Sequence, residues 1–367
     1  MLKDFEQQVT EADGQQNQCN RRFHFFPASS LCAEPKPTSW LVKPYFDAGS
    51  LAMIFGEPGS MKSFLSIDLG LCIAANLNWQ GHDVRQSGPV FYIAGEGLNG
   101  LNHRTKAWEI HHCVDLKDVP FFVSDRPAQF LDEQSAGEVI QAVDDLCEAN
   151  GNPFLVIIDT LNRNFGPGDE NSTADMTRFI SIIDESIRSH YRCAVLIIHH
   201  SGLSATERAR GASALRAALD WEYRLQKNAD GTRILTCTKT KDHAEPPVIY
   251  FKPEIITLEG WVDPEDGEVM TSCVLCRVEG ATMNTRPLSG AKKVAFDALF
   301  AIGDEYVHID TWRDTAYSAG ISPTSSQGAK QKAFKRAVLD LRTAGLVDTK
   351  DDYWWVKKSP GQAGHSA

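Results

Sequence analysis

The stretch "MIFGEPGSMKSFLSIDLG", residues 53–70, joins an apolar run to a helix-like run through a glycine-rich turn. It fits the phosphate-loop pattern G-x-x-x-x-G-K-[ST], except that Met61 replaces the second glycine. In this pattern Lys62 reaches the terminal phosphates and the Ser63 hydroxyl binds Mg²⁺. The turn offers backbone N–H groups, and the helix adds its positive dipole end. The loop therefore predicts a nucleotide site made by Gly56, Glu57, Pro58, Gly59, Ser60, Met61, Lys62, Ser63 and Phe64.

Met61 is the departure that needs a physical account. A glycine before the lysine usually allows a close backbone approach or an unusual dihedral angle. A methionine fits if its dihedral angles are ordinary and its side chain points away from the phosphates. We therefore expect Met61 to face the protein or a neighbouring subunit, and a side chain that filled the phosphate cavity would argue against hydrolysis.

Outward from this loop, apolar segments of strand length alternate with segments of helical length. Near-continuous apolar strands that alternate with helices are typical of a parallel sheet covered on both faces. The fold class is therefore α/β, with a mostly parallel central sheet. We expect strands at 51–55, 89–97, 153–160 and 193–202, and helices at 63–77, 135–149 and 175–190.

Polar residues follow the expected strands, where ligands bind in such sheets. Asp159 ends an apolar run, like a Walker-B acid that reaches Mg²⁺ directly or through water. Glu96 ends the preceding strand and is a candidate to take a proton from the attacking water. Either His199 or His200 is a candidate to hydrogen-bond the terminal phosphate. Strand-end capping by Asp159 and helix capping by Glu96 are the structural alternatives.

After residue 222 the pattern changes to a hairpin around Asp230 and Gly231, followed by further strands. The last part of the chain has the order helix, strand, helix, helix, strand, strand, with Asp310 as an expected helix cap. This order indicates a winged helix-turn-helix. The expected division is a partly ordered segment at 1–37, a core domain at 38–282, a linker at 283–288, a winged-helix-like domain at 289–358 and a tail at 359–367.

The helix expected at 328–345 has two different faces. Apolar residues share one face, and the other face carries a basic stripe that is either a solvated surface or a surface for nucleic acid or a partner. The stripe consists of Lys332, Lys335, Arg336 and Arg342. Residues 285–367 carry 12 Lys and Arg against 9 Asp and Glu, whereas the whole chain has a net charge of -11. The protein is thus not coated in positive charge, and its end is the basic part.

Composition gives three further expectations. A hydrophobic share of 42% and a charged share of 23% are ordinary for a globular protein. No apolar run approaches the ~20 residues that cross a bilayer, and the polar N-terminus has no signal-peptide core, so we expect a cytoplasmic protein without a membrane partner. Cys273 and Cys276 form a C-x-x-C without a second pair at zinc spacing, which favours a reduced pair on a strand over a metal or redox site.

Five blocks in order carry a family resemblance: "GEPGSMKSFLSIDLGLCIAA", "GPVFYIAGEGLNGLNHRTKAW", "LVIIDTLNRNFGPGDENSTADM", "VLIIHHSG" and "RARGASALRAALD". Together, over about residues 38–260, they resemble the RepA-like, RecA-fold ATPases of plasmids and phages (the AAA_25 type). That group is allied to hexameric replicative helicases. The resemblance implies a RecA-like P-loop NTPase core that uses ATP and Mg²⁺.

The resemblance also implies roles for particular residues. Glu96 would be the catalytic carboxylate, and Lys62 with Ser63 would bind the phosphates and Mg²⁺. Asp159 would be the Walker-B acid, and His200 (or His199) would couple the terminal phosphate to DNA-contacting loops. Asp169, Glu170 and Asn171 match a "GDEN" block of functional or structural role. In RecA-fold rings a neighbouring subunit supplies a cation to the site, and the candidates here are Arg210, Arg208, Lys239 and Lys241.

Three functions remain open from the sequence. The first is an ATP-driven motor on single-stranded DNA, acting as a homo-oligomeric ring, with a hexamer favoured. The second is an ATP-switched initiator or regulatory protein whose winged helix binds duplex DNA without unwinding it. The third is an interaction module that binds ATP but barely hydrolyses it.

Overall fold

The computed structural model describes most of the chain in several ranges. These are residues 25, 27–31, 37–95, 98–201, 213–278, 290–303, 306–322, 324, 326–343 and 346–356. The expected linker at 283–288 and tail at 359–367 lie outside them, as does most of the segment at 1–37.

A nine-stranded sheet forms the centre of the fold, in the order β11-β10-β9-β8-β3-β7-β6-β4-β5. From β5 to β8 neighbouring strands pair in parallel, and from β8 to β11 they pair antiparallel. The prediction of a mostly parallel sheet is therefore confirmed. The strands are β3 (Leu51–Gly56), β4 (Val90–Ala94), β5 (Phe121–Val123), β6 (Leu155–Asp159), β7 (Ala194–His200), β8 (Trp221–Lys227), β9 (Arg233–Thr240), β10 (Ile249–Val262) and β11 (Val269–Arg277).

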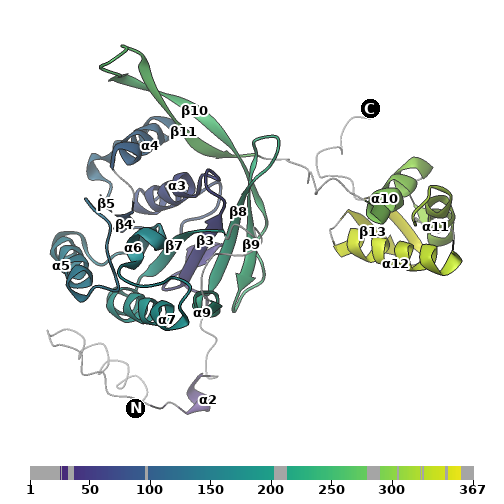
Figure 1. The fold of residues 1–367 in the computed structure, drawn as a ribbon, viewed down its shortest axis with the longest axis horizontal. Helices are drawn as coiled ribbons and strands as arrows, with labels where there is room; N and C mark the ends of the chain where they lie inside the picture. The colour runs from purple at the N-terminus through teal and green to yellow at the C-terminus, as the bar shows by residue number, and fades with distance from the viewer. Residues whose placement is uncertain are drawn as a thin grey trace.

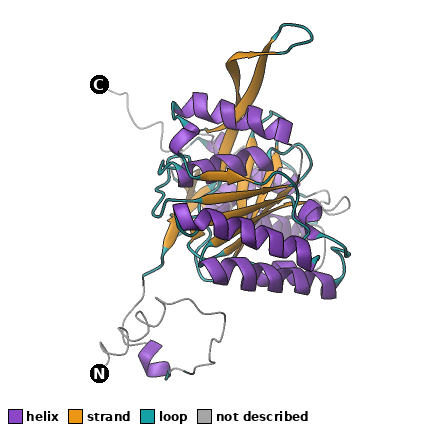
Figure 2. Cartoon of the chain, turned by 90° about the vertical axis from the view of Figure 1, so that its left-hand side faces the viewer, coloured by secondary structure: helices purple, strands orange, loops and turns teal. Residues whose placement is uncertain are grey.

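Helices cover both faces of this sheet, as Figures 1 and 2 show. Each parallel strand is apolar on both sides, because successive side chains point to opposite faces. On β7, Leu196 and Ile198 enter one apolar cluster, and Val195 and Ile197 enter the other. The first cluster packs under α3 (Lys62–Ala74) and α4 (Leu98–His112), the second under α5 (Glu133–Asn150) and α7 (Thr173–Ile182). The helix of α7 continues through a π-helical turn η2 (Ile183–Arg188) into α8 (Ser189–Tyr191).

The shorter elements are less regular. They are α2 (Ala28–Leu31), the two-stranded sheet of β1 (Trp40–Val42) and β2 (Phe46–Asp47), η1 (Leu116–Asp118), α6 (Leu161–Phe165) and α9 (Ser213–Ala218). Helix starts follow capping chemistry: the Asp132 side chain accepts from Ser135 N at α5, and that of Ser172 accepts from Asp175 N at α7.

The antiparallel end of the sheet forms two hairpins. In the turn between β8 and β9 Gly231 has a φ of 85°, as an Asp-Gly turn requires. The β10–β11 hairpin projects beyond the sheet, and α4 lies against it (Figure 1). This contact closes over a small apolar cluster that contains Ala107, Leu258 and Val274.

The C-terminal unit has a core of its own, built around the buried Trp312. Its elements are α10 (Gly290–Ile302), β12 (Val307–His308), α11 (Ile309–Ser318), α12 (Gln327–Thr343), β13 (Val347–Lys350) and β14 (Tyr353–Val356), with the strand order β12-β14-β13. The order of helices and strands is the expected one, and the winged helix-turn-helix itself stays a prediction. The prediction that Asp310 caps α11 is wrong. The N-cap is His308, whose Nδ1 accepts from Asp310 N at 3.3 Å, and Asp310 pairs with Arg313 in the first turn. Among the described helices, none has the length and apolar character to cross a membrane.

Candidate nucleotide site

The glycine-rich loop runs from the end of β3 to the start of α3, and packing fixes its first residue. A Cβ on Gly56 would lie 2.2 Å from the Leu225 carbonyl oxygen of β8, so no larger residue fits. Gly59 has a φ of 74°, which only glycine adopts without cost. The backbone thus turns sharply between β3 and α3 and packs closely against β8, as a phosphate loop requires.

Met61 adopts a φ of 74° and a ψ of 31° at the N-cap of α3. The condition of ordinary dihedral angles is therefore not met. This left-handed conformation costs a non-glycine residue about 1–2 kcal/mol. The Met61 side chain packs against the apolar cluster under α3. The loop thus keeps the backbone shape that the missing glycine usually gives, with the methionine side chain packed on the protein.

Lys62 lies inside the loop with its side chain buried. Its Nζ donates to Gly56 O and Glu57 O at 3.0 Å each and to Ser60 Oγ at 3.4 Å. No described side chain caps the first turn of α3. A bound anion could therefore take the place of a capping side chain. The N–H groups of that turn would donate hydrogen bonds to it, and the helix dipole would attract it.

Ser63 and Asp159 come together beside the loop. Both line a cavity of about 150 Å³ with Tyr92, Ala94, Gly100, Leu101 and Arg104. The hydroxyl of Tyr92 donates a short hydrogen bond to Asp159 Oδ2. Burial, reinforced by the Asp159 charge, holds the Tyr92 pKa well above its usual value, so Tyr92 stays a neutral donor. A hydroxyl and an oriented carboxylate are oxygen ligands that suit Mg²⁺.

Arg104 was missed by the sequence reasoning. It lies on α4 and lines the same cavity as Ser63 and Asp159. Its Cζ lies 4.6 Å from the centre of the Phe64 ring, a cation–π contact with a residue of the predicted loop. The signal in the sequence was helical spacing, because Gly100 and Arg104 are four residues apart on one face of the helix after Glu96.

His199 and His200 lie on opposite faces of β7. Gly56 pairs with His200 and Phe55 with His199 in the parallel register. Since side chains alternate, His200 lies on the face of Ile198, towards α3 and Asp159, and His199 on the face of Val195. Position alone therefore favours His200 for a role at the phosphates.

Three of the predicted catalytic residues lie outside the described residues: Glu96, Arg208 and Arg210. The strand before Glu96 is described, and it ends at Ala94 in register with Asp159. Gly95 N donates to Asp159 O at 2.5 Å. Gly95 therefore lies directly beside the end of β6.

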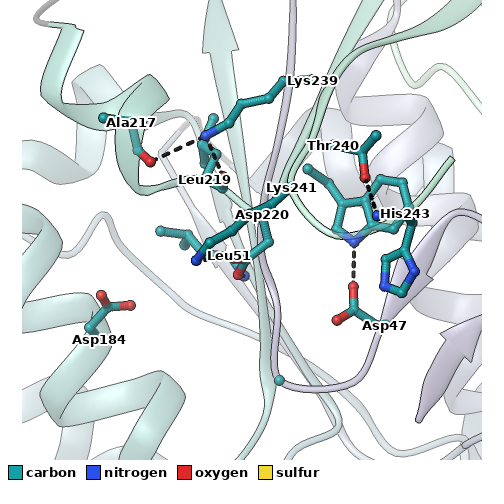
Figure 3. A network of polar contacts seen from close by, with 12 residues as sticks. Asp47, Leu51, Asp184, Ala217, Leu219, Asp220, Lys239, Thr240, Lys241 and His243 are labelled. Carbon is teal, nitrogen blue, oxygen red and sulfur yellow. Dashed lines mark hydrogen bonds and ion pairs between the residues drawn. The ribbon is translucent and has the colours of Figure 1, made fainter. Parts of the chain in front are cut away.

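Lys239 and Lys241 lie at the end of β9 (Figure 3). Lys239 Nζ donates to the carbonyls of Arg216 and Leu219 at 2.6 Å each and of Ala217 at 3.2 Å. The lysine thus binds the C-terminal end of α9, and burial lowers its pKa. Lys241 Nζ lies 3.5 Å from Asp220 Oδ1, and its side chain is 60% exposed. Of these two candidates, Lys241 has the side chain that can reach outward.

The GDEN residues form a local turn. Asp169 Oδ1 accepts from Asn171 N and Nδ2 at 2.9 Å each, and Asp169 N donates to Asp175 Oδ2 at 3.0 Å. Glu170 is buried, with Oε2 3.4 Å from Asn162 Nδ2. These contacts stabilise the turn before α7, and a functional role of the block stays a prediction.

The basic stripe is on the surface of α12. Lys332, Lys335, Arg336 and Arg342 are all exposed, while Phe334 and Leu341 are buried in the core of the unit. Arg342 Cζ lies 6.0 Å from the centre of the Trp354 ring. The two faces of the helix are thus separated as the sequence predicts, and the contacts assign no ligand to the basic one.

Comparison with known families identifies the core. The model of an AAA domain (AAA_25) matches residues 17–205, more than half of the chain, including the loop, Asp159 and His200. The chain belongs to this AAA domain family. The AAA domain supports the P-loop ATPase part of the resemblance, while the RepA-like helicase stays a prediction.

Two further comparisons complete the description of this AAA-domain protein. Its structure is similar to the crystal structure of the RadB recombinase, with a TM-score of 0.41 and 16% sequence identity. The similarity covers 61% of this chain and 92% of that chain. None of the curated proteins matches the sequence.

Proposed function

We propose that this AAA-domain protein is a RepA-like replicative motor that hydrolyses ATP and acts on DNA of a phage, plasmid or other mobile element. The supporting observation is the cavity at the loop, where Ser63 and Asp159 meet Arg104 at the carboxyl ends of parallel strands. A phosphate chain that entered this site would have the N-terminus of α3 on one side and Arg104 on the other.

The residues divide the work at the phosphates. Lys62 and the N–H groups of the loop bind the terminal phosphates of ATP, and Ser63 and Asp159 hold Mg²⁺. The ion, when bound, neutralises phosphate charge. Tyr92 orients Asp159 through its hydrogen bond. Glu96 accepts the proton of the attacking water, and His200 responds to the terminal phosphate.

A cation from the neighbouring subunit completes the proposed site. Arg208, Arg210 and Lys241 are the candidates that this proposal keeps, because Lys239 is engaged by the carbonyls at the end of α9. A cation supplied in trans places hydrolysis at subunit boundaries, as in a ring, with a hexamer favoured. Mass measurement with and without an ATP analogue and Mg²⁺ tests this. A monomer under both conditions would contradict trans catalysis.

Turnover in the presence of DNA distinguishes the motor from the alternative. We expect single-stranded DNA to stimulate ATP hydrolysis, and Glu96→Gln to remove the stimulated rate. Glu133→Gln is the matched control, because its side chain is 91% exposed on α5. If the unchanged protein shows no ATP turnover, and Glu96→Gln gives the same result, the protein would be an ATP-binding module and not a motor.

The exposed stripe on α12 favours a second candidate, an ATP-switched protein that binds duplex DNA. If α12 contacts phosphates, Lys332→Ala and Lys335→Ala each weaken duplex binding and lower the slope of log affinity against log salt by about 1. Lys117→Ala is the control, an exposed lysine of the core. Stimulation by duplex DNA alone, with this loss of slope, would replace the motor by the switch.

A further inference from the structure

A mixed set of donor atoms lies where the end of α4 meets the β10–β11 hairpin. Cys276 Sγ of β11 lies 3.8 Å from His111 Nε2 of α4 and 3.2 Å from Glu254 Oε2 of β10. All three donor atoms lie within 4.8 Å of one another. The two strands of the hairpin and the distant helix α4 thus each contribute one sulfur, nitrogen or oxygen donor to one point.

The spacing of these donors matches a tetrahedral metal centre. Zinc bonds of about 2.3 Å to sulfur and about 2.0–2.1 Å to nitrogen or oxygen place neighbouring ligand atoms about 3.6 Å apart. The two distances from Cys276 Sγ, 3.8 and 3.2 Å, lie on either side of that value. A cavity of about 350 Å³ adjoins the site and is lined by His111 and Cys276. It leaves room for a water ligand.

The neighbouring set of donors is different. Asp68, Cys72 and His112 also lie within reach of one another, but there the carboxylate already has hydrogen-bond donors. Asp68 accepts from Gln80 Nε2 at 2.8 Å and from Trp108 Nε1 at 3.0 Å, inside a largely buried cluster. These bonds explain that carboxylate as a structural group. At the second set, His111 and Glu254 are exposed and open to an ion.

The partner cysteine of the C-x-x-C takes no part. A spacing of three residues on a strand puts Cys273 and Cys276 on opposite faces. Cys276 faces α4 with Val274, whereas Cys273 pairs across the hairpin with Ile255 on the other face. Cys273 is therefore a matched control on the same strand.

We propose that Cys276, His111 and Glu254 bind one divalent metal ion of the zinc class, with water as the fourth ligand. Binding replaces the S–H···O hydrogen bond by a metal–thiolate bond, and the thiol proton leaves to the solvent without any redox step. The ion joins the C-terminal end of α4 to the β10–β11 hairpin. Because α4 carries Arg104, the ion also steadies the helix that lines the nucleotide cavity.

Cobalt titration of the untagged, full-length protein tests this site, because Co²⁺ bound to a thiolate gives a charge-transfer absorption band. We expect one Co²⁺ per chain, with the band lost in Cys276→Ser and kept in Cys273→Ser. His111→Gln and Glu254→Gln should weaken binding at least about tenfold, since even outer ligand partners contribute 10–100-fold to affinity. Absence of the band, or a band that persists in Cys276→Ser, would overturn the proposal.

A stability measurement separates ligand loss from misfolding. Zn²⁺ should raise the unfolding midpoint of the unchanged protein and of Cys273→Ser, and should leave that of Glu254→Gln nearly unchanged. Glu254 is exposed, so this variant keeps its circular-dichroism spectrum without metal. An equal Zn²⁺ shift in Glu254→Gln and the unchanged protein would contradict the three-ligand site. Neither readout depends on ATP.

Discussion

Two lysines of this protein, at opposite ends of two helices, are held by similar oxygen atoms. Lys62 Nζ at the N-terminus of α3 contacts two carbonyls and a hydroxyl. Lys239 Nζ at the C-terminus of α9 contacts three carbonyls. The two lysines differ in the helix end that each contacts. A cation at a C-terminus is stabilised by the helix dipole, whereas a cation at an N-terminus is opposed by it.

This contrast shows which lysine is suited to a ligand. An anion at the start of α3 would accept hydrogen bonds from the N–H groups of the first turn and would offset the unfavourable interaction of the Lys62 ammonium with the helix dipole. At α9 the ammonium already satisfies the last carbonyls, and an anion would compete with them. We therefore expect Lys62 to act on a ligand, whereas Lys239 binds its own chain, which argues against Lys239 as the trans cation.

The largest expected effect is at Lys62. Lys62→Ala should weaken ATP binding at least about 100-fold, because it removes a buried charge that the proposed function places at the phosphates. Isothermal titration with a non-hydrolysable ATP analogue measures this, with Lys239→Met as the matched control. Normal affinity in Lys62→Ala would break the comparison and the nucleotide assignment with it.

Arg104 is a third cation, and it lines the cavity beside the loop together with Ser63 and Asp159. Arg104→Ala should lower ATP turnover about 10- to 100-fold, the range of a charged hydrogen bond of about 1.5–3 kcal/mol. Steady-state kinetics would check it, beside Arg85→Ala as a surface control whose side chain pairs with Asp83. Unchanged turnover would mean that Arg104 only packs on Phe64.

Lys239 should matter for stability and not for ATP affinity. Lys239→Met removes the cation that satisfies the end of α9 and should cost about 1–2 kcal/mol of unfolding free energy. Urea denaturation gives this value. A loss of ATP turnover only in assembled protein, with stability unchanged, would instead assign Lys239 to the neighbouring site.

Lys241 should give the smallest change in stability. Its pair with Asp220 is exposed on the lysine side, so Lys241→Met should cost less than about 1 kcal/mol. The same denaturation experiment applies. A cost as large as that of Lys239→Met would show that the end of β9, and not the end of α9, sets the stability of this region.

Local chemistry explains which parts of the fold were predictable. The four central strands are apolar on both faces, so their approximate positions along the chain could be predicted from runs such as "PFLVIIDT". The phosphate-loop pattern predicted Lys62 and Ser63 as site residues, and the position of Asp159 at the end of an apolar run predicted it as the acid. The parallel register then brings Ser63 and Asp159 to one cavity, as expected from the carboxyl ends of such strands.

Features that depend on tertiary packing could not be read in this way. The helix α4 is polar and contains Gly100, so its helical periodicity is weak in the sequence. The helix was therefore not predicted, and Arg104 on it was missed. The sequence could not tell which conformation Met61 adopts, and in the structure it has a positive φ. The metal-ligand set needs α4 to lie on the β10–β11 hairpin, and the search for a second C-x-x-C could not detect it.

The contact of Gly56 with the Leu225 carbonyl also has a mechanical consequence. The phosphate loop has no slack towards β8, and β8 is hydrogen-bonded along its length to β9. Packed interiors transmit strain because they are nearly incompressible. A displacement of the β8–β9 hairpin should therefore be transmitted to the phosphate loop, and a load applied at Asp230 should shift the loop.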